Sequence, residues 1–337
     1  MPLGGVENDF SDAQLAEAIT PRLREIFADQ LTSIADVRML AGGASTDARV
    51  FTVRGTQRED RRLVIRIDRM RESRPGQAAR EAQAMRAAAK QGALVPEVFD
   101  WSDGNAQVGA PFLIMGFLQG EALPGRILRG AQFGTARSKL IRQIARSAAA
   151  THSVTPSSGL DAIPHTDHFG EVEARYRELH IARPAIELGL SWLHEHQPAG
   201  RDPRLVHGDF RLGNLIVGAE GLRGVLDWEF AHWGDPIEDL GFLAVPAWRW
   251  GGAGEVAGVG SVEELLREYE YAAGEQVNRE EFRWWQVLGV LRWAVGCLLQ
   301  AQRHLSGNTR SIELVSLGRR AAEQEYDLLR LIRGEPV

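Results

Sequence analysis

Alternating apolar residues end near residue 118, and helix-like spacing replaces them in the rest of the chain. The early period-two runs are short, rich in β-branched residues and bounded by glycine or charged turns, which is typical of half-buried strands. The predicted strands are residues 34–40, 49–53, 63–67, 96–101 and 111–118. Helices are expected at residues 11–29, where apolar residues recur every four positions, and in the alanine-rich stretch 77–90 before Gly92. The first part of the chain is therefore predicted to be a small antiparallel sheet with a helix inserted after the third strand.

Long helices dominate the sequence after Gly120. They are predicted at residues 131–152, 168–180 and 182–196, and from Pro236 onward. Short apolar runs interrupt them around residues 205–206, 215–217 and 224–226. This order of elements predicts an α+β fold. Its small antiparallel-sheet lobe is expected to span residues 1–118 and its larger, mainly helical lobe residues 119–337, and the length is ample for two such lobes.

The composition excludes several classes of protein. The formal net charge is −6, from 39 basic and 45 acidic residues, which argues against nucleic acid or an anionic membrane as the main partner. The single cysteine, Cys297, excludes a disulfide framework and a cysteine-based zinc finger. The first residues lack a signal-peptide pattern, and the most apolar stretch, 287–299, is interrupted by Arg292 and too short to span a membrane. A cytoplasmic protein is expected, and its oligomeric state stays open.

The segment His207-Gly208-Asp209 carries the strongest chemical signal in the sequence. Asn214 follows Asp209 by five residues, and Asp227 comes thirteen residues after Asn214. Phosphoryl transfer from a nucleotide requires a carboxylate beside the acceptor hydroxyl and oxygen ligands that hold magnesium across the phosphates. Asp209 can accept the acceptor proton, while Asn214 and Asp227 can bind Mg²⁺. Each residue alone would be typical of a turn or a cap, and the three together indicate a phosphotransferase.

This motif resembles that of the phosphotransferase family that includes aminoglycoside phosphotransferases and choline kinases, a branch of the protein-kinase-like fold with two lobes. The similarity extends over approximately residues 30–330 and rests on His207-Gly208-Asp209, Asn214 and Asp227-Trp228. It implies ATP or GTP as the phosphoryl donor, Mg²⁺ as the cofactor and a catalytic role for Asp209. Asn214 and Asp227 are implied as metal ligands. His207 and Asp239 are implied to support the catalytic loop.

Gly42 and Gly43 lie between two predicted strands, which suits a flap over phosphates better than a loop that opens a helix. A Gly-Gly turn taken alone is more often an ordinary hairpin, but its position ahead of the Arg66 strand favours the phosphate interpretation. The neighbouring Ser45 and Thr46 could donate hydrogen bonds to a phosphate. These residues are therefore expected to bind the nucleotide, mainly through their backbone amides.

The resemblance assigns residues 111–118 to the connection between the lobes. It implies that the adenine ring binds backbone groups near Met115 and Phe117. An ordinary buried strand fits the same sequence, and the residues alone do not separate the two interpretations.

The sequence departs from the family pattern on its third strand. The kinase-like fold normally has a lysine there, but the only two lysines, Lys90 and Lys139, lie in helix-like segments, and Arg66 occupies the position. Arginine stays charged and grips phosphate through a planar fork, although it is not geometrically interchangeable with lysine. Glu81, on the following helix, resembles the glutamate that pairs with the strand's cation; alternatively it is a solvent-exposed helix residue. A branch related to the kinase-like domains fused to certain acyl-CoA dehydrogenases is similar in having arginine at this place, which favours an active enzyme.

The residues after Gly234 are interpreted as scaffold. Asp235, Pro236 and Glu238 match an acidic capping box at the start of a helix. Asp239, which follows them, falls where the family has a buried aspartate beneath the catalytic loop. None of the three acids is expected to contact a reactant.

The histidines do not predict a metal site. Those predicted to lie on the surface, because they lack partners at metal-ligand spacing, are His165, His168, His194 and His196. An iron site built from His207, Asp209 and a later histidine is disfavoured, because such sites usually sit in β-rich barrels and this part of the chain is largely helical.

The acceptor is expected to bind in the helical lobe. Trp248-Arg249-Trp250 could frame a pocket for an anionic or planar group, because arginine pairs with carboxylate or phosphate and tryptophan stacks. Most of the tryptophans alternatively pack in the core. The family branch and Arg249 favour a hydroxyacid or a hydroxyacyl-CoA as the acceptor. Acidic residues such as Glu229 and those within 263–270 could instead suit a cationic aminoglycoside, although acids on a helix usually face solvent.

Three functions are distinguished. The first is a small-molecule kinase that phosphorylates a hydroxyl group, with an aminoglycoside as the alternative acceptor. The second is a nucleotide-binding pseudokinase without catalysis, suggested by Arg66. The third, protein kinase activity, is disfavoured because only seven residues separate Asp227 from Asp235, which leaves no evident activation segment.

Overall fold

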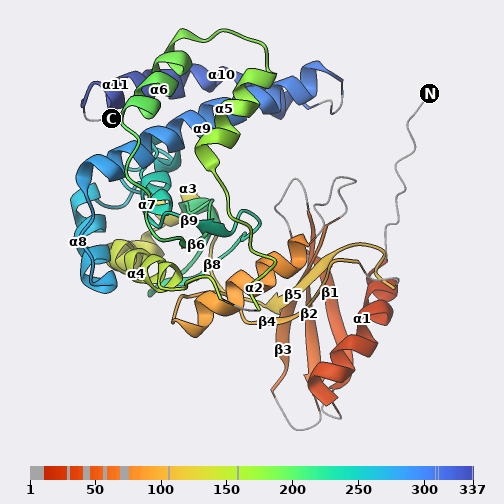
Figure 1. Cartoon of the computed structure of the whole chain (residues 1–337). Helices are drawn as coiled ribbons and strands as arrows, with labels where there is room; N and C mark the ends of the chain where they lie inside the picture. Colours follow the sequence, from red (N-terminus) through yellow and green to blue (C-terminus); the bar gives the residue numbers. More distant parts are fainter. Residues whose placement is uncertain are drawn as a thin grey trace. The chain divides into compact units, whose positions relative to one another are not determined.

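The computed structural model of the protein describes residues 11–28, 31–40, 46–55, 59–68, 76–104, 107–157, 159–307, 309, 311–335 and 337. The chain divides into two compact units (Figure 1). The first comprises residues 1–86 and 96–118, and the second comprises residues 87–95 and 119–337. Each unit has a hydrophobic core of its own.

The first unit contains a five-stranded antiparallel sheet. Its elements are α1 (Asp12–Phe27), β1 (Leu31–Met39), β2 (Thr46–Gly55), β3 (Arg61–Asp68), most of α2 (Gln77–Lys90), β4 (Val98–Ser102) and β5 (Phe112–Gly116). The strands are ordered β1-β2-β3-β5-β4, and every neighbouring pair is antiparallel. A capping box starts α1, because the amide of Gln14 donates to the Ser11 hydroxyl and the amide of Ser11 donates to the Gln14 side chain.

Alternation along β3 separates a core face from a polar face. Leu63, Ile65 and Ile67 are buried and pack with apolar residues of α1. Successive side chains of a strand point to opposite faces of the sheet, so Arg66 lies on the face away from this core. It is central in the sheet, since β3 pairs with both β2 and β5 at this position. The apolar pattern of the strand thus keeps the Arg66 side chain out of the core.

The second unit is mainly helical. Its helices are the last residues of α2, α3 (Pro124–Arg129), α4 (Gly134–His152), α5 (His168–Glu178), α6 (Pro184–Glu195), α7 (Ile237–Leu243), α8 (Val262–Ala273), α9 (Arg279–Leu305), α10 (Ile312–Arg319) and α11 (Ala321–Ile332). Its strands are β6 (Arg204–Val206), β7 (Leu215–Gly218), β8 (Gly221–Val225) and β9 (His232–Gly234). Short 3₁₀ turns lie at Ala131–Phe133, Leu212–Asn214 and Pro246–Arg249.

Helix α9 lies at the centre of this unit's core (Figure 1). Its residues Val287, Val290 and Leu291 are fully buried and pack among apolar side chains of α5, α6, α7 and α11. Asn278 starts the helix, because its side-chain oxygen accepts hydrogen bonds from the amides of Glu280 and Glu281. In the part of the chain that the structure describes, neither α9 nor any other helix has the length and apolarity to cross a membrane.

Two small, two-stranded antiparallel sheets position the loops that carry the sequence motif. Strand β6 pairs with β9, and β7 pairs with β8. Residues 207–214 follow β6, and Asp227 lies in the connection from β8 to β9. These two sheets therefore bring segments that are distant in the sequence into one region of the second unit.

The architecture confirms the predicted α+β fold, with an antiparallel sheet in the first unit and a mainly helical second unit. The helix predicted at residues 77–90 forms over those residues. Helices resume after Pro236, as predicted, in α7 to α11, but a 3₁₀ turn and the glycine-rich residues 250–260 separate α7, which ends at Leu243, from α8. Proline and clustered glycine oppose helix propagation, which explains the interruption.

Candidate functional site

Hydrogen bonds of the buried His207 hold the loop that follows β6. Its backbone amide donates to Oδ2 of Asp239 at 2.8 Å. Ring atom Nδ1 lies 3.1 Å from the backbone amide nitrogen of Asp209 and therefore accepts its hydrogen. Nε2 lies 2.8 Å from the carbonyl oxygen of Leu226, to which it can only donate. These contacts fix a neutral ring with its proton on Nε2, so His207 ties the loop to the segment after β8.

Gly208 allows the loop to turn. Its φ is +79°, a left-handed conformation that glycine adopts without steric cost. A Cβ atom at this position would lie 2.5 Å from the carbonyl oxygen of Phe230. The Gly208 amide donates to Oδ1 of Asp239 at 2.9 Å. The two oxygens of Asp239 therefore hold two consecutive amides of the loop.

Asp239 is buried in α7, and a histidine far from it in the sequence binds its carboxylate. His152, in the last turn of α4, donates from Nε2 to Oδ2 of Asp239 at 3.1 Å. The other ring nitrogen of His152 lies 2.9 Å from the hydroxyl of Tyr269 in α8. Burial alone raises the pKa of Asp239, but the hydrogen bond with His152 opposes this, and the net pKa is lowered. Sequence reasoning missed His152 and Tyr269, because no local motif links them to Asp239.

The Asp209 carboxylate is oriented by two side chains. Asn214 donates from Nδ2 to Oδ2 of Asp209 at 2.7 Å and to its backbone carbonyl oxygen at 2.8 Å. Arg211 donates from Nε to both carboxylate oxygens, at 3.0 and 3.2 Å. The Asp209 side chain is 13% exposed, so a reactant can reach it. This geometry suits a proton acceptor. Arg211 was not identified from the sequence, although it lies two residues after Asp209.

A backbone hydrogen bond brings Asp227 next to Asn214. The carbonyl oxygen of Asn214 accepts from the amide of Leu226 at 2.8 Å. Asp227 follows with a φ of +65°, and Trp228 after it is buried. Because Nδ2 of Asn214 is bound to Asp209, the Asn214 side-chain oxygen is the atom left to face a cation. Amide and carboxylate oxygens are ligands that Mg²⁺ accepts, so these residues fit a magnesium ion.

In the first unit, Arg66 and Glu81 form an ion pair between β3 and α2. Glu81 is 2% exposed and also accepts a hydrogen bond from the Gln77 side chain at 3.3 Å. The alternative reading of Glu81 as a solvent-exposed helix residue is therefore wrong. The guanidinium of Arg66 on β3 is therefore held by the buried carboxylate of Glu81.

The segment around Met115 has already used some of its backbone donors. The amide of Gly116 donates to the carbonyl oxygen of Glu97 at 2.8 Å, and the amide of Phe117 donates to that of Arg62 at 3.0 Å. Within the described chain, the amide of Leu118 makes no such bond. A nucleotide base that binds here would therefore hydrogen-bond to carbonyl oxygens or to the Leu118 amide instead of the Phe117 amide.

The expected phosphate flap is not covered by the structure. Gly42, Gly43 and Ser45 lie outside the described residues. Thr46 is the first residue of β2, and its side chain also lies outside them. The nucleotide contacts expected of these four residues remain predictions.

The capping contact predicted for Glu238 and the surface position predicted for His168 are wrong. Glu238 is 5% exposed and lies in the first turn of α7, but its carboxylate contacts other buried side chains instead of the backbone at the start of the helix. Its contacts are Nδ1 of His168 at 2.5 Å, Nε2 of His232 at 3.3 Å and Nη1 of Arg292 at 3.5 Å. His168 is therefore a buried partner of Glu238 and not a surface residue. The two histidines pair with a glutamate seventy and six residues away from them, which their local spacing does not reveal.

The same cluster has the residue types of a metal site. Ligand atoms of His168, His232 and Glu238 lie within 4.8 Å of one another. The guanidinium of Arg292 beside Glu238 opposes a further cation. Burial alone raises the pKa of Glu238, but the charges and hydrogen bonds of His168 and His232 outweigh it and hold the pKa well below its usual value. A buried ion-pair network explains this cluster better than a metal centre.

Arg249 does not serve as an anion-binding residue in this structure. Its Nη1 donates to the backbone oxygen of Val337 at 2.7 Å, and its Nε donates to the carbonyl oxygen of Glu255 at 3.0 Å. Trp248 is buried, whereas Trp250 is 38% exposed. Of the three residues expected to frame an acceptor pocket, Trp250 is the one placed to contact a ligand.

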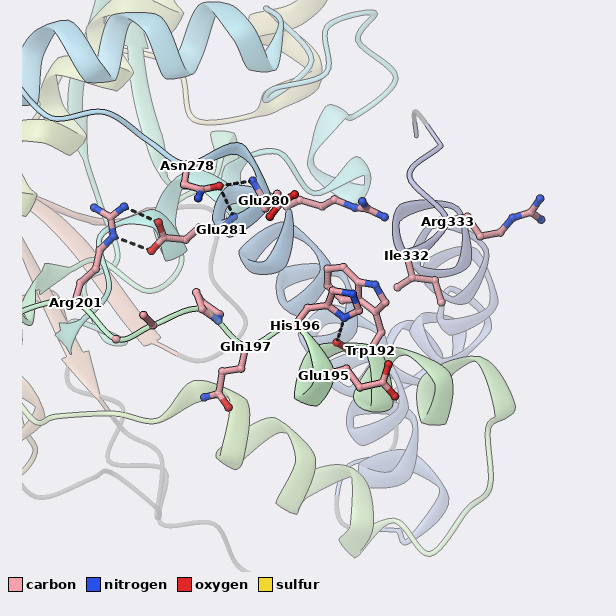
Figure 2. A pocket seen from close by; sticks show the side chains of 14 residues that line it. Trp192, Glu195, His196, Gln197, Arg201, Asn278, Glu280, Glu281, Ile332 and Arg333 are labelled. Carbon is pink, nitrogen blue, oxygen red and sulfur yellow. Dashed lines mark hydrogen bonds and ion pairs between the residues drawn. The ribbon is translucent and has the colours of Figure 1, made fainter.

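A separate cavity of about 900 Å³ lies at the end of α6, next to α9 and the end of α11 (Figure 2). Arg201 donates two hydrogen bonds to Glu281 within it, at 2.7 and 2.5 Å. The rings of Trp192 and His196 stack at 4.5 Å. None of the predicted site residues lines this cavity, so it is distinct from the loop that carries Asp209.

Comparison with known sequences identifies the family. The model of the phosphotransferase enzyme family matches residues 36–285. Acyl-CoA dehydrogenase family member 10 of Mus musculus is 32% identical over 200 residues, which cover 54% of this chain and 18% of that protein. Acyl-CoA dehydrogenase family member 11 of Homo sapiens is 25% identical over 250 residues, which cover 69% of this chain and 32% of that protein. The aligned part thus spans a third or less of these curated relatives.

Solved structures share the fold. A protein of Ralstonia eutropha JMP134 provisionally described as an aminoglycoside phosphotransferase superimposes with a TM-score of 0.74 at 20% identity, covering 95% of this chain and 99% of that one. A thermostable mutant of the aminoglycoside phosphotransferase APH(4)-Ia, in ternary complex with AMP-PNP and hygromycin B, gives 0.62 at 18% identity, covering 94% and 98%. The GDP complex of aminoglycoside 2′-phosphotransferase-IIIa gives 0.60 at 14% identity, covering 94% and 99%.

The family match includes the β3 strand with Arg66 and the segment from His207 to Asp227. The fold and family predicted from the motif are confirmed. The chain belongs to the phosphotransferase enzyme family and has the kinase-like fold of aminoglycoside phosphotransferases.

Proposed function

We propose that this protein transfers the γ-phosphoryl group of ATP or GTP to a hydroxyl group of a small molecule. The observation that carries the proposal is the Asp209 carboxylate, which Asn214 and Arg211 orient on a loop anchored by Asp239. Structures with the same fold contain AMP-PNP or GDP, which supports a nucleotide as the donor. Residues 1–118 would bind the nucleotide, and residues 119–337 would supply the catalytic loop and the acceptor site.

In the proposed transfer, one bond to the γ-phosphorus forms while another breaks. The acceptor oxygen forms a bond to the γ-phosphorus, and the bond from that phosphorus to the β-bridging oxygen breaks. The nucleoside diphosphate leaves with the electron pair, and the acceptor proton passes to Asp209. Asn214 and Asp227 would hold Mg²⁺, which neutralises charge on the phosphates. Arg66, held by Glu81, would contact phosphate oxygens from the first unit.

The acceptor that we favour is a hydroxyacid or a hydroxyacyl-CoA. Arg211 supports an anionic acceptor, because its cation lies directly beside Asp209. The names of the curated relatives, acyl-CoA dehydrogenase family members, support an acyl compound.

A second candidate acceptor is an aminoglycoside. A cavity of about 320 Å³ beside Trp250 is lined by Asp327 and by an ion pair of Arg320 and Glu323, and the carboxylate of Asp327 suits a cationic ligand. A neighbour in fold contains hygromycin B. A pseudokinase that binds nucleotide without transferring phosphate is disfavoured, because Asp209, Asn214 and Asp227 are all present and brought together.

Mass spectrometry of phosphorylated products tests the proposal. The protein is incubated with Mg²⁺ and either ATP or GTP against hydroxyacids, hydroxyacyl-CoA thioesters and aminoglycosides. The comparison includes Asp209→Asn and a matched control, Asp202→Asn, which changes an exposed aspartate shortly before the loop. A product that forms with the wild type and the control but not with Asp209→Asn is expected. Nucleotide binding without any product would favour the pseudokinase.

A further inference from the structure

A cavity of about 480 Å³ lies in the second unit between α3, the start of α4 and residues 250–259. Two arginines, Arg129 and Arg137, belong to its lining, and Trp250 forms part of the wall. No aspartate or glutamate lines it among the described residues. Its volume falls in the range of small-molecule sites, and its charge selects an anion.

Neither of these arginines is neutralised by a carboxylate within the described part of the chain. Arg137 is oriented by Nη1, which donates to the carbonyl oxygens of Ile127 and Gly130 at 2.8 Å each. Its other nitrogens make no hydrogen bond to described residues. Arg126 on the same helix as Arg129 is different, since it pairs with a glutamate at 3.3 Å. Two guanidinium groups without acidic partners in one cavity are typical of a site for carboxylate or phosphate.

The glycine-rich residues 251–260 give the cavity a wall of backbone. A Cβ at Gly252 would lie 2.4 Å from the carbonyl oxygen of Gly258, and one at Gly258 would lie 2.4 Å from that of Arg249, so the close approach of the chain to itself requires glycine there. The amides of Gly251 and Ala253, both in the lining, donate no hydrogen bond to any residue that the structure describes. Unused amides beside two arginines add hydrogen-bond donors for an oxyanion.

Trp250 connects the cavity to the catalytic loop. Its φ of +52° is a strained conformation for a bulky residue, and such strain concentrates at functional sites. Its ring atom Cζ2 lies 3.9 Å from the place of a Cβ on Gly213, in the same loop as Asp209. The neighbouring Trp248 ring lies under the guanidinium of Arg211, at 5.2 Å from the ring centre. A ligand in the cavity can therefore extend past Trp250 towards Asp209.

We propose that this cavity binds an oxyanion group at the far end of the acceptor, whose hydroxyl lies at Asp209. The inference rests on the proposed phosphotransferase function and specifies its acceptor as anionic. The oxyanion is either the carboxylate of a hydroxyacid or a phosphate of a hydroxyacyl-CoA, because both present the same chemistry to Arg129 and Arg137. A polycationic aminoglycoside would be repelled from this cavity.

The first test measures binding without turnover. The parent is Asp209→Asn with AMP-PNP and Mg²⁺ present, and the probes are 4-hydroxybutyrate and 4′-phosphopantetheine, titrated by calorimetry. Arg129→Gln should weaken binding of the preferred probe about tenfold or more, because it removes a charged donor. Ala253→Glu, which places a like charge in the lining, should weaken it further. The probe that binds tighter identifies the source of the oxyanion.

The matched control is Arg126→Gln, the same substitution on the same helix outside the cavity lining. It should bind the probes like the parent. Failure of both probes to bind, or equal binding by the parent, Arg129→Gln and Ala253→Glu, would overturn the cavity assignment.

A second test separates this inference from the kinase proposal. With Asp209 restored, Arg129→Gln should raise the KM of an anionic acceptor about tenfold and leave the KM of the nucleotide unchanged. Turnover of an anionic acceptor with an unchanged KM in Arg129→Gln would overturn the cavity and leave the kinase intact. Binding that depends on Arg129, with no turnover of any acceptor, would support the cavity and contradict the kinase.

Discussion

At the scale of single residues, the charged groups of the candidate site are oriented by partners within the protein. Asn214 and Arg211 fix the Asp209 carboxylate, and Glu81 fixes Arg66. A reactive group that is already oriented does not have to be ordered when the substrate binds, which lowers the barrier to reaction. Substitutions that keep charge but change shape therefore test these positions sharply.

Arg66→Lys is expected to weaken nucleotide binding. Lysine keeps the positive charge but loses the planar fork that fits both Glu81 and a phosphate. The dissociation constant of the protein for AMP-PNP in the presence of Mg²⁺, measured by calorimetry, should rise about tenfold. Arg61→Lys, at the start of the same strand with a side chain 45% exposed, is the control and should bind normally. Equal affinity of Arg66→Lys and wild type would show that Arg66 does not contact the phosphates.

Gly208→Ala is expected to destabilise the protein and abolish activity. The new Cβ meets the carbonyl oxygen of Phe230, and alanine is strained at a φ of +79°. Together these effects should cost about 2 kcal/mol or more, which lowers the Tm by about 3 °C or more in calorimetry for a chain of this length. Gly200→Ala is the control, since an added Cβ there meets no atom within 4 Å. A Tm within a degree of wild type for Gly208→Ala would contradict the role given to this turn.

At the scale of elements, the sequence predicted those whose signal is local. Helix α2 and strand β3 carry a clear periodicity and form where expected. Strand β9 was missed because its three residues follow a loop and depend on pairing with β6. The contacts beneath the catalytic loop follow the same rule: the motif marks Asp239, whereas His152 on α4 has no local signal. Partners that are joined only by helix packing cannot be found from spacing along one chain.

Asp235, at the start of α7, should make stability depend on pH. Its Oδ1 accepts a hydrogen bond from the amide of Ile237, but burial raises the pKa of Asp235 from 3.8 to about 7, and nearby Glu281 adds to the rise. Between about pH 4 and pH 7 the folded state therefore binds more protons at this site than the unfolded state does. The free energy of unfolding falls as the pH rises through this window, because the ionised form is disfavoured in the fold.

Asp235→Asn removes this titration while its side-chain oxygen can still cap the helix. The free energy of unfolding is measured by urea unfolding of both proteins at pH 5 and at pH 8. The variant minus wild-type difference in this free energy should be more positive at pH 8 than at pH 5. Groups that do not interact with Asp235 titrate alike in both proteins and cancel in the difference. A difference between variant and wild type that is the same at pH 5 and pH 8 would contradict the raised pKa of Asp235.

At the scale of the whole molecule, the residues expected to bind nucleotide and those expected to catalyse transfer lie in different units. Arg66 and Glu81 belong to the first, and Asp209, Asn214 and Asp227 belong to the second. The family and its fold were predictable because the motif combines several residues at fixed spacing. The cavity proposed here for the acceptor was not predictable, because residues 250–260 and Arg129 come together only through tertiary packing. In a phosphotransferase of this kind, the substitutions that abolish phosphoryl transfer should differ from those that weaken nucleotide binding.

The decisive measurement pairs product formation with nucleotide affinity in Asp209→Asn, using an acceptor that wild type phosphorylates. The rate of product formation at saturating nucleotide should fall by about a thousandfold, because the proton acceptor is lost. The dissociation constant for Mg²⁺ with AMP-PNP should stay within about threefold of wild type, since Asp209 is not the residue assigned to hold the metal. Asp227→Asn should instead weaken nucleotide binding itself. Full turnover by Asp209→Asn would contradict the assignment of Asp209 as the catalytic residue.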